Sequence, residues 1–567
     1  MRILHKSTTS SRYEVSGEVT MAQCPCDATG HTPSRSLTEC FGKIDWKFWR
    51  RRMWFVQLAY STGKWICFLF AWLKMSSKLP AMIFSAPIKE EVLELDFSES
   101  NPVSVRRKVR PKRSDDREKP SFSRWDVLPD ILLEDIYSRL SIKERYYASQ
   151  VCRNWNRIFY SKIVWETFIL NDRTLTRRKF NYYMGDQYVL DHHRTQLCLH
   201  RVARGFRKLI IKPMENFLNL YEFMTNLSYF CENYEPLVRI KTLDFTFGCN
   251  FSAEDVQGSN KVFGTGGKIL EALKRLMDDL TGLKHLSLQD LLLEKEEAKF
   301  LLDDVVYNCC ESMRTLKLVN CSKNPYAMLH PAVFVNLKSL TLSPQHLGDE
   351  NLLLLATNRL PDLYLLQTKL TPARVTPVPP KAWRECAKTW PLMRVHHVLE
   401  GDVEKPIVWQ EGAPVRSIVF NTPDIKVCVT SLFTASNMYS NTLEVFAYPG
   451  VPTYPPMDYF EDRADTALIL LSKCCLFLDT LVLRDIISTA SILLLATQSN
   501  NLRRLVVRKS ALIFKCDWPH NPEWSDSFYD WLKLTSGCCQ KVTEEVSRLL
   551  ECKWHPLSDE EFMSFKL

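Results

Sequence analysis

The sequence predicts an α/β protein in which a small helical unit precedes a solenoid of short parallel strands with outer helices. Two patterns support this prediction: apolar residues at helical spacing between residues 124 and 165, and a leucine pattern that recurs after residue 205. The composition agrees, since 46% of the 567 residues are hydrophobic and 25% are charged, as in soluble globular proteins. A chain of this length is expected to contain at least two domains.

The first segment, residues 1–104, is expected to be a flexible N-terminal region that contains a hydrophobic stretch at residues 53–73. These 21 residues could span a hydrocarbon core of about 30 Å. However, Lys64 stands in the middle, and the aromatic and polar residues also fit a buried or interfacial helix. We therefore expect no membrane span, with a membrane anchor as the alternative. Translation from Met75 would remove the stretch altogether.

A basic linker follows at residues 105–122. Between Ser104 and Pro120, eight basic and three acidic residues give 8 − 3 = +5, out of a net charge of +9. Most of the excess charge is therefore local, and no nucleic-acid partner is expected. The run from Arg106 to Arg113 fits a nuclear-import signal or a solvated linker equally well.

The helical unit is expected at residues 123–170. Pro129 suits the first turn of a helix, because its missing N–H would have no partner there. Ser141 and Glu144 form a capping box that begins a second helix, and Trp165 closes the unit. The apolar face consists of Leu132, Leu133, Ile136, Tyr137 and Leu140, then Ala148, Val151, Trp155 and Ile158. About 45 residues bury little surface, so a partner is expected.

This segment resembles an F-box, whose pattern begins Leu-Pro, continues with a leucine- and isoleucine-rich helix and ends in Val-Cys-Arg-x-Trp. The resemblance implies binding to the Skp adaptor, which joins a cullin scaffold and a RING-finger protein. The implied adaptor-binding residues are Leu128, Pro129, Leu132, Leu133, Ile136, Leu140, Val151, Cys152 and Trp155. One departure is Ile131, where an acidic residue is usual; it either weakens a polar contact or enlarges the apolar surface without abolishing docking.

A linker is expected at residues 171–204, a repeat domain at 205–515 and a C-terminal cap at 516–567. The pattern LxxLxL has clear copies from Leu283, Met313, Leu337, Leu360, Leu478 and Leu502, and weaker ones from Phe206, Ile240, Val415 and Thr442. Several are 23 or 24 residues apart, within the range of leucine-rich repeats, which the segment resembles in an irregular form. Residues 296–309 and 465–478 fit the return helices, and their paired cysteines are expected to be small buried side chains.

No catalytic residue, metal site or cofactor is expected. The 19 cysteines contain no CxxC pair, and GTGGK at residues 264–268 lacks the spacing of a phosphate-binding loop. The pairs His192/His193 and His396/His397 have no acidic or cysteine ligands at helical spacing, so surface or turn positions are expected.

The sequence therefore predicts a non-catalytic substrate-recognition subunit of an SCF-type ubiquitin ligase, in the cytoplasm or nucleus. Its proline-rich stretches 371–380 and 449–456 are expected to be loops that project from the repeats. Expected substrate-binding residues lie between the core leucines of the sheet: Lys284, Ser287, Arg314, Lys317, Lys338 and Thr341. The alternatives are a membrane-anchored repeat protein and a scaffold that binds the adaptor without ubiquitin transfer.

Overall fold

The computed structural model describes residues 125–182, 185–233, 239–248, 267–403, 406–455, 459–499 and 501–567. These residues all belong to one compact unit, Lys119–Leu567. The hydrophobic stretch 53–73 and the basic linker 105–122 lie outside the described residues.

Three short helices follow a 3-10 turn, η1 (Trp125–Val127): α4 (Asp130–Arg139), α5 (Ile142–Ser149) and α6 (Arg153–Phe159). Helix α4 begins directly after Pro129. The capping box predicted for α5 is confirmed, because Ser141 Oγ accepts the Glu144 N–H and Glu144 Oε2 accepts the Ser141 N–H at 2.8 Å. The predicted helical unit is thus present.

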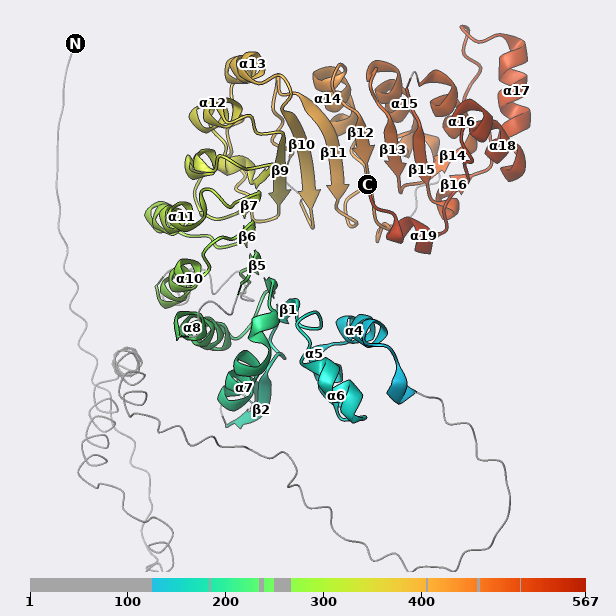
Figure 1. The fold of residues 1–567 in the computed structure, drawn as a ribbon. Coiled ribbons are helices and arrows are strands. Elements are labelled where there is room, and N and C mark those ends of the chain that lie inside the picture. The colour runs from blue at the N-terminus through green and yellow to red at the C-terminus, as the bar shows by residue number, and fades with distance from the viewer. Residues whose placement is uncertain are drawn as a thin grey trace, which may run out of the picture. The chain divides into compact units, whose positions relative to one another are not determined.

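A twelve-stranded parallel sheet follows, with its strands in chain order apart from the omitted short elements (Figure 1). The strands are β1 (Thr167–Leu170), β4 (Lys208–Ile211), β5 (Thr242–Thr246), β6 (His285–Gln289), β7 (Thr315–Val319), β8 (Ser339–Leu342), β9 (Asp362–Thr368), β10 (Arg394–Glu400), β11 (Val415–Asn421), β12 (Val445–Ala447), β13 (Thr480–Leu483) and β15 (Arg504–Val507). Each of the ten predicted leucine patterns forms a strand. Strands β1 and β10 were not predicted.

The connecting helices lie along one face of the sheet (Figure 1). They are α8 (Phe217–Asn233), α10 (Lys268–Asp279), α11 (Lys295–Cys309), α12 (Asp349–Thr357), α13 (Pro380–Thr389), α14 (Val429–Tyr439), α15 (Asp465–Cys474) and α16 (Thr489–Gln498). Short 3-10 turns occur at η4 (His330–Val333) and η5 (Pro344–His346), between β7 and α12, and at η6 (Phe460–Asp462) and η7 (Lys509–Ala511). Helices α11 and α15 are the two return helices predicted from the sequence. The predicted α/β solenoid is confirmed.

The core lies between the sheet and these helices. The middle leucines of the repeats are paired in register from strand to strand and are at most 2% exposed: Leu209, Leu243, Leu286, Leu316, Leu340 and Leu363. Burying each such side chain stabilises the fold by roughly 2 kcal/mol. Because one leucine is added per repeat, the core extends along the whole row of strands.

Residues 171–204 fold rather than form the expected linker. They contain an antiparallel hairpin, β2 (Thr176–Asn181) and β3 (Gly185–Leu190), then α7 (His192–Val202) and the 3-10 turn η2 (Ala203–Gly205). Asn219 of α8 anchors the hairpin, since its Oδ1 accepts the Leu190 N–H at 2.8 Å. Strands are usually recognised by alternating apolar and polar residues, and β2, with the sequence TRRKFN, lacks this alternation.

The C-terminal residues cover the last strand of the sheet. They form α17 (Asp526–Ser536), α18 (Cys539–Leu549) and α19 (Asp559–Ser564), and short strands β14 (Ile487–Ser488) and β16 (Leu512–Ile513) pair nearby. Trp554 Nε1 donates to the Leu505 carbonyl of β15 at 2.6 Å, and the Leu557 N–H donates to Val507 at 2.9 Å. These bonds occupy carbonyl groups that would otherwise be free at a sheet edge.

Candidate functional site

The helical unit packs around a few buried side chains, which continue into the core of the solenoid. Leu133, Tyr137, Ile158 and Trp165 are each at most 2% exposed. The Tyr137 hydroxyl donates to the Trp155 carbonyl at 3.0 Å, and burial raises the pKa of this tyrosine to about 12. The three helices are therefore held together by a few apolar side chains and by hydrogen bonds between α4 and α6.

Arg145 of α5 is the charged residue at the centre of this core, and sequence reasoning missed it. Its guanidinium donates to the carbonyl oxygens of Tyr137 at 2.9 Å, Leu140 at 3.0 Å and Val164 at 2.7 Å. It also lies 5.2 Å from the ring centroid of Trp165. Burial lowers the pKa of Arg145, but an arginine stays charged in proteins. The residue joins the end of α4 to the segment that leads into β1.

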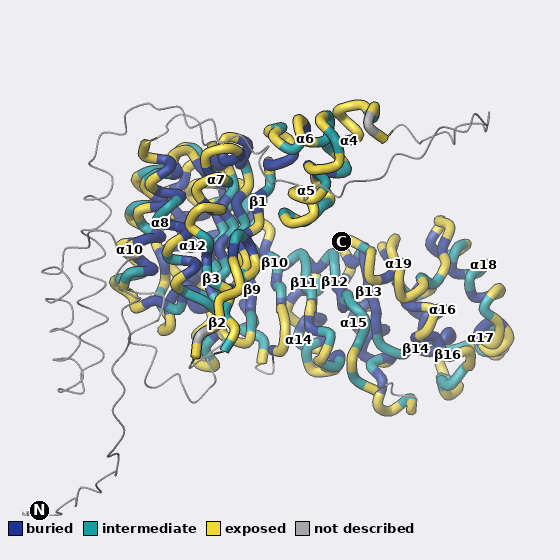
Figure 2. Tube along the Cα trace, turned by 90° about the horizontal axis from the view of Figure 1, so that it is seen from below, coloured by how far each residue is buried: buried dark blue, intermediate teal, exposed yellow. Residues whose placement is uncertain are grey.

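Several large apolar side chains of the unit lie outside this core and are exposed to solvent. Those exposed are Trp125, Val127, Ile131, Leu132, Tyr146, Tyr147, Val151, Tyr160 and Ile163. Figure 2 shows the same: much of α4, α5 and α6 is drawn as exposed, whereas the strands of the sheet are mostly buried or intermediate. Nine exposed apolar side chains lie within about 40 residues, and exposed apolar patches are typical of surfaces that bind other molecules.

The nine expected adaptor-binding residues divide by burial. Pro129, Leu132 and Val151 are exposed, while Leu128, Ile136, Leu140, Cys152 and Trp155 are partly buried. Leu133 is fully buried and presents no surface to a partner, so its position gives no support to its expected role at the interface. Helical spacing identified the apolar residues but did not separate the core side from the outer side.

Ile131, noted as a departure from the family pattern, is 78% exposed. It follows Asp130, whose carboxylate pairs with Arg157 of α6 at 2.6 Å; this hydrogen bond holds the pKa of Asp130 below its usual value. The acidic side chain next to Ile131 is therefore already engaged within the unit. Ile131 was expected either to weaken a polar contact or to enlarge the apolar surface, and its exposure agrees with the second effect.

The six expected substrate-binding residues lie in two rows. Ser287, Lys317 and Thr341 are paired in register on β6, β7 and β8, and each is half-buried. Lys284, Arg314 and Lys338 are exposed but directly precede these strands, so they lie along the edge of the sheet where the strands begin. The expectation that all six share the face of the sheet is wrong for this second row.

The histidine pairs differ from each other. His192 and His193 open α7 and are exposed, as expected. His396 and His397 lie within β10 instead of a turn, and burial lowers the pKa of His397 to about 4. The Tyr439 hydroxyl lies 3.4 Å from His397 Nε2. Within the described ranges no group of three histidine, cysteine, aspartate or glutamate residues could hold a metal ion.

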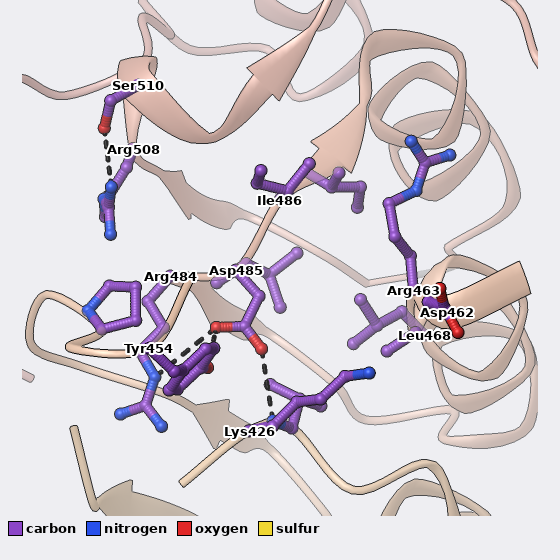
Figure 3. Close-up of a pocket in the computed structure, with 15 residues that line it drawn as sticks. Lys426, Tyr454, Asp462, Arg463, Leu468, Arg484, Asp485, Ile486, Arg508 and Ser510 are labelled. Carbon is purple, nitrogen blue, oxygen red and sulfur yellow. Dashed lines mark hydrogen bonds and ion pairs between the residues drawn. The ribbon is translucent and has the colours of Figure 1, made fainter. Parts of the chain in front are cut away.

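A cavity of about 250 Å³ lies beyond the ends of β13 and β15 and contains three buried arginines in its wall. Figure 3 shows that their guanidinium groups do not converge on one point. Each has partners within the protein: Arg463 with Asp465 and Asp517, Arg484 with the carbonyl oxygens of Thr422, Ile425 and Pro449, and Arg508 with Asp559 and Ser510. The proline-rich loop contributes Tyr454, which donates to Asp485. The cavity is a structural junction between loops.

No helix in the described part of the chain is long and apolar enough to cross a membrane. A protein-family model matches residues 125–171, which correspond to the helical unit and the first strand of the sheet. The model is described as F-box-like. The exposed apolar helices and the buried side chains between them therefore belong to an F-box-like domain.

Proposed function

We propose that the chain is the substrate-recognition subunit of an SCF-type ubiquitin ligase. The F-box-like domain binds the Skp adaptor, which joins the cullin scaffold and the RING-finger protein. The solenoid, interpreted as irregular leucine-rich repeats, holds the target protein. The chain contributes binding and no catalytic group, and it acts in the cytoplasm or the nucleus, where these partners work.

The observation that carries this proposal is the exposure of large apolar residues on the F-box-like domain. Ile131 is 78% exposed and Leu132 is 51% exposed, next to the fully buried Leu133. Leaving such side chains in water is unfavourable, and burying one in an interface contributes roughly 1.5–3 kcal/mol. A partner with an apolar groove is the binding class that this surface fits.

The register of the repeats supports a role for the solenoid in holding a target. On the face opposite the connecting helices, half-buried polar residues follow one another across the strands: Asp244, Ser287, Lys317, Thr341, Tyr364, His396 and Ser417. A rigid row of polar side chains can present hydrogen-bonding groups at fixed spacing.

Two substitutions on the exposed side of α4 test the proposal. Ile131→Glu with Leu132→Glu is expected to abolish co-precipitation of the Skp adaptor and the cullin from cells. The matched control is Leu392→Glu, which places a charge at another exposed leucine, 68% exposed and outside the domain. Equal recovery with both variants would contradict the proposal. Recovery of cullin without ubiquitin transfer to any bound target would favour a scaffold.

A further inference from the structure

The edge where the strands of the sheet begin carries a row of basic residues. Five basic residues directly precede the first residues of the successive strands β4, β5, β6, β7 and β8: Arg207, Lys241, Lys284, Arg314 and Lys338. Their backbones form one continuous hydrogen-bonded ladder: Lys241 N–H to Arg207 O at 2.8 Å, Lys284 to Lys241 at 2.8 Å, Arg314 to Lys284 at 2.7 Å and Lys338 to Arg314 at 2.8 Å. We call these five residues the basic edge.

The basic edge has no charge partners within the described chain. Lys241, Lys284, Arg314 and Lys338 are exposed and make no ion pair with another described residue, and Arg207 donates only to backbone carbonyl groups. Three acidic residues lie nearby: Glu166 directly precedes β1, and its carbonyl accepts the Arg207 N–H at 2.9 Å. Along the chain, Asp244 follows Lys241 by three residues and Glu311 precedes Arg314 by three residues. Like charges on neighbouring strands repel each other, so this arrangement weakens the fold.

The same edge is arranged differently in the last repeats. There the corresponding residues are Arg416, Glu444, Asp479 and Arg503, joined by the same backbone ladder. Their charges cancel in pairs: Arg416 lies 2.7 Å from Glu444, and Arg503 lies 3.8 Å from Asp479. The solenoid can therefore neutralise this edge by itself. Strands β4 to β8 leave it positive, and this contrast points to an external partner.

The geometry points to an acidic partner peptide, and we propose that the basic edge binds an extended acidic segment of the target protein. Strands lie about 4.8 Å apart, so five positions span roughly 19 Å, the length of about six extended residues. Aspartate, glutamate or phosphoserine side chains supply the charge. The proposal rests on the proposed function, because it specifies what the solenoid recognises in a target.

A peptide fits the basic edge better than a single-stranded nucleic acid does. Sites for single strands combine basic side chains with aromatic ones on which the bases stack. Here the positions that follow the basic residues carry Lys208, Thr242, His285, Thr315 and Ser339. None of these five is a phenylalanine, tyrosine or tryptophan. Hydroxyl and imidazole groups are able to hydrogen-bond to carboxylates or phosphates.

The test uses the full chain bound to its adaptor and a fluorescein-labelled octaglutamate peptide, with anisotropy as the readout. The variant Lys241→Glu, Lys284→Glu, Arg314→Glu, Lys338→Glu is expected to bind the peptide at least tenfold more weakly. The control Lys299→Glu, Lys381→Glu, Arg384→Glu, Lys388→Glu makes the same change of net charge at exposed positions of α11 and α13 and should stay within twofold. Equal losses in both variants, or none in either, would overturn the proposal.

Further arms separate the possible sources of the negative charge. A serine peptide with three phosphoserines that binds more tightly than octaglutamate, with the same dependence on the basic edge, would assign the site to phosphorylated targets. A twelve-residue oligothymidylate that binds as tightly as either peptide would overturn the choice of a peptide. The milder Lys284→Gln, Arg314→Gln variant guards against loss of folding and should weaken binding at least threefold, with an unchanged melting temperature.

Failure of this proposal can be distinguished from failure of the proposed function. The four-residue variant of the basic edge should retain wild-type affinity for the purified Skp adaptor, whereas Ile131→Glu, Leu132→Glu should lose the adaptor and bind octaglutamate normally. If the basic-edge variant instead loses the adaptor, the edge is part of the adaptor interface and the peptide proposal is wrong.

Discussion

The guanidinium of Arg145 lies 5.2 Å from the ring centroid of Trp165, among the buried side chains of the helical unit. From there it donates to four carbonyl groups, those of Tyr137, Ser138, Leu140 and Val164, and so joins α4, α5 and the segment before β1. The F-box-like domain is thus fixed by a buried charge as much as by apolar packing. The arrangement leaves the remaining apolar residues of α4 and α5 free to face a partner.

Removal of this charge should destabilise the domain selectively. Arg145→Ala removes the guanidinium donor from the carbonyl groups of Leu140 and Val164, and a buried group without a partner costs about 1–3 kcal/mol. We expect a loss of at least about 3 kcal/mol, seen as faster hydrogen exchange in residues 130–166. The solenoid should keep its protection. Unchanged exchange in this domain would show that Arg145 is dispensable.

Asn320 should be important for the turn after β7. It is fully buried at a φ of +49°, and its Nδ2 donates to Asp290 at 2.7 Å and to Thr368 at 2.8 Å. Asn320→Ala loses both bonds and strains the backbone, so we expect a loss of about 2–4 kcal/mol in thermal or urea denaturation. Asn320→Gly tolerates the φ and should cost less. The exposed Asn336→Ala serves as the control.

Stability should fall between pH 6.5 and pH 4 because of buried histidines. Burial lowers the pKa of His346 to about 4, and its Nε2 accepts the Cys321 N–H at 3.1 Å. In this window the unfolded chain takes up a proton that the folded chain does not, so unfolding becomes easier as the pH falls. The loss per such histidine approaches roughly 3 kcal/mol near pH 4.

Urea midpoints measured from pH 7.5 to pH 4.5 test this expectation. The variant His346→Gln should be less stable at pH 7.5 but should lose less stability on acidification. His397, whose pKa is also lowered to about 4, accounts for part of the remaining slope. An identical slope in the wild type and in the His346→Gln variant would contradict the assignment to His346.

The C-terminal tail should detach when one aromatic residue is removed. Phe562 of α19 is 2% exposed and packs on Ala447 and Val482, on the face of the sheet opposite the connecting helices. Phe562→Ala is expected to weaken this contact by about 3 kcal/mol. The result should be protease cleavage after residue 550 and exposure of the valines beneath. Met563→Ala, at the neighbouring exposed position, should leave the tail resistant.

The repeats could be predicted from the sequence because their signal is local. Each leucine pattern carries its own spacing, and all ten copies became strands. Strand β10 was not predicted because the leucine pattern is broken there. His397 is paired with Leu365 of β9 and stands where the pattern has an apolar residue. The docking of Phe562 on Ala447 depends on a contact more than a hundred residues away along the chain, which no local pattern encodes.

The candidate site could be predicted only in part. The spacing of Leu132 and Leu133 placed both on the apolar side of a helix, yet one is 51% exposed and the other fully buried. Periodicity gives the direction of a side chain along a helix but not which neighbouring element covers it. The sequence identified three residues of the basic edge, Lys284, Arg314 and Lys338, as separate positions. That they form one continuous row with Arg207 and Lys241 follows only from the pairing of the strands.

The most direct test of the central claim is a calorimetric titration of the purified chain with the purified Skp adaptor at several temperatures. The account predicts a complex with a negative heat-capacity change, as expected for burial of an apolar surface. With Ile131→Glu and Leu132→Glu, binding should be lost, while Leu392→Glu should match the wild type. Absence of binding by the wild-type chain, or an unchanged affinity in the double variant, would contradict the claim.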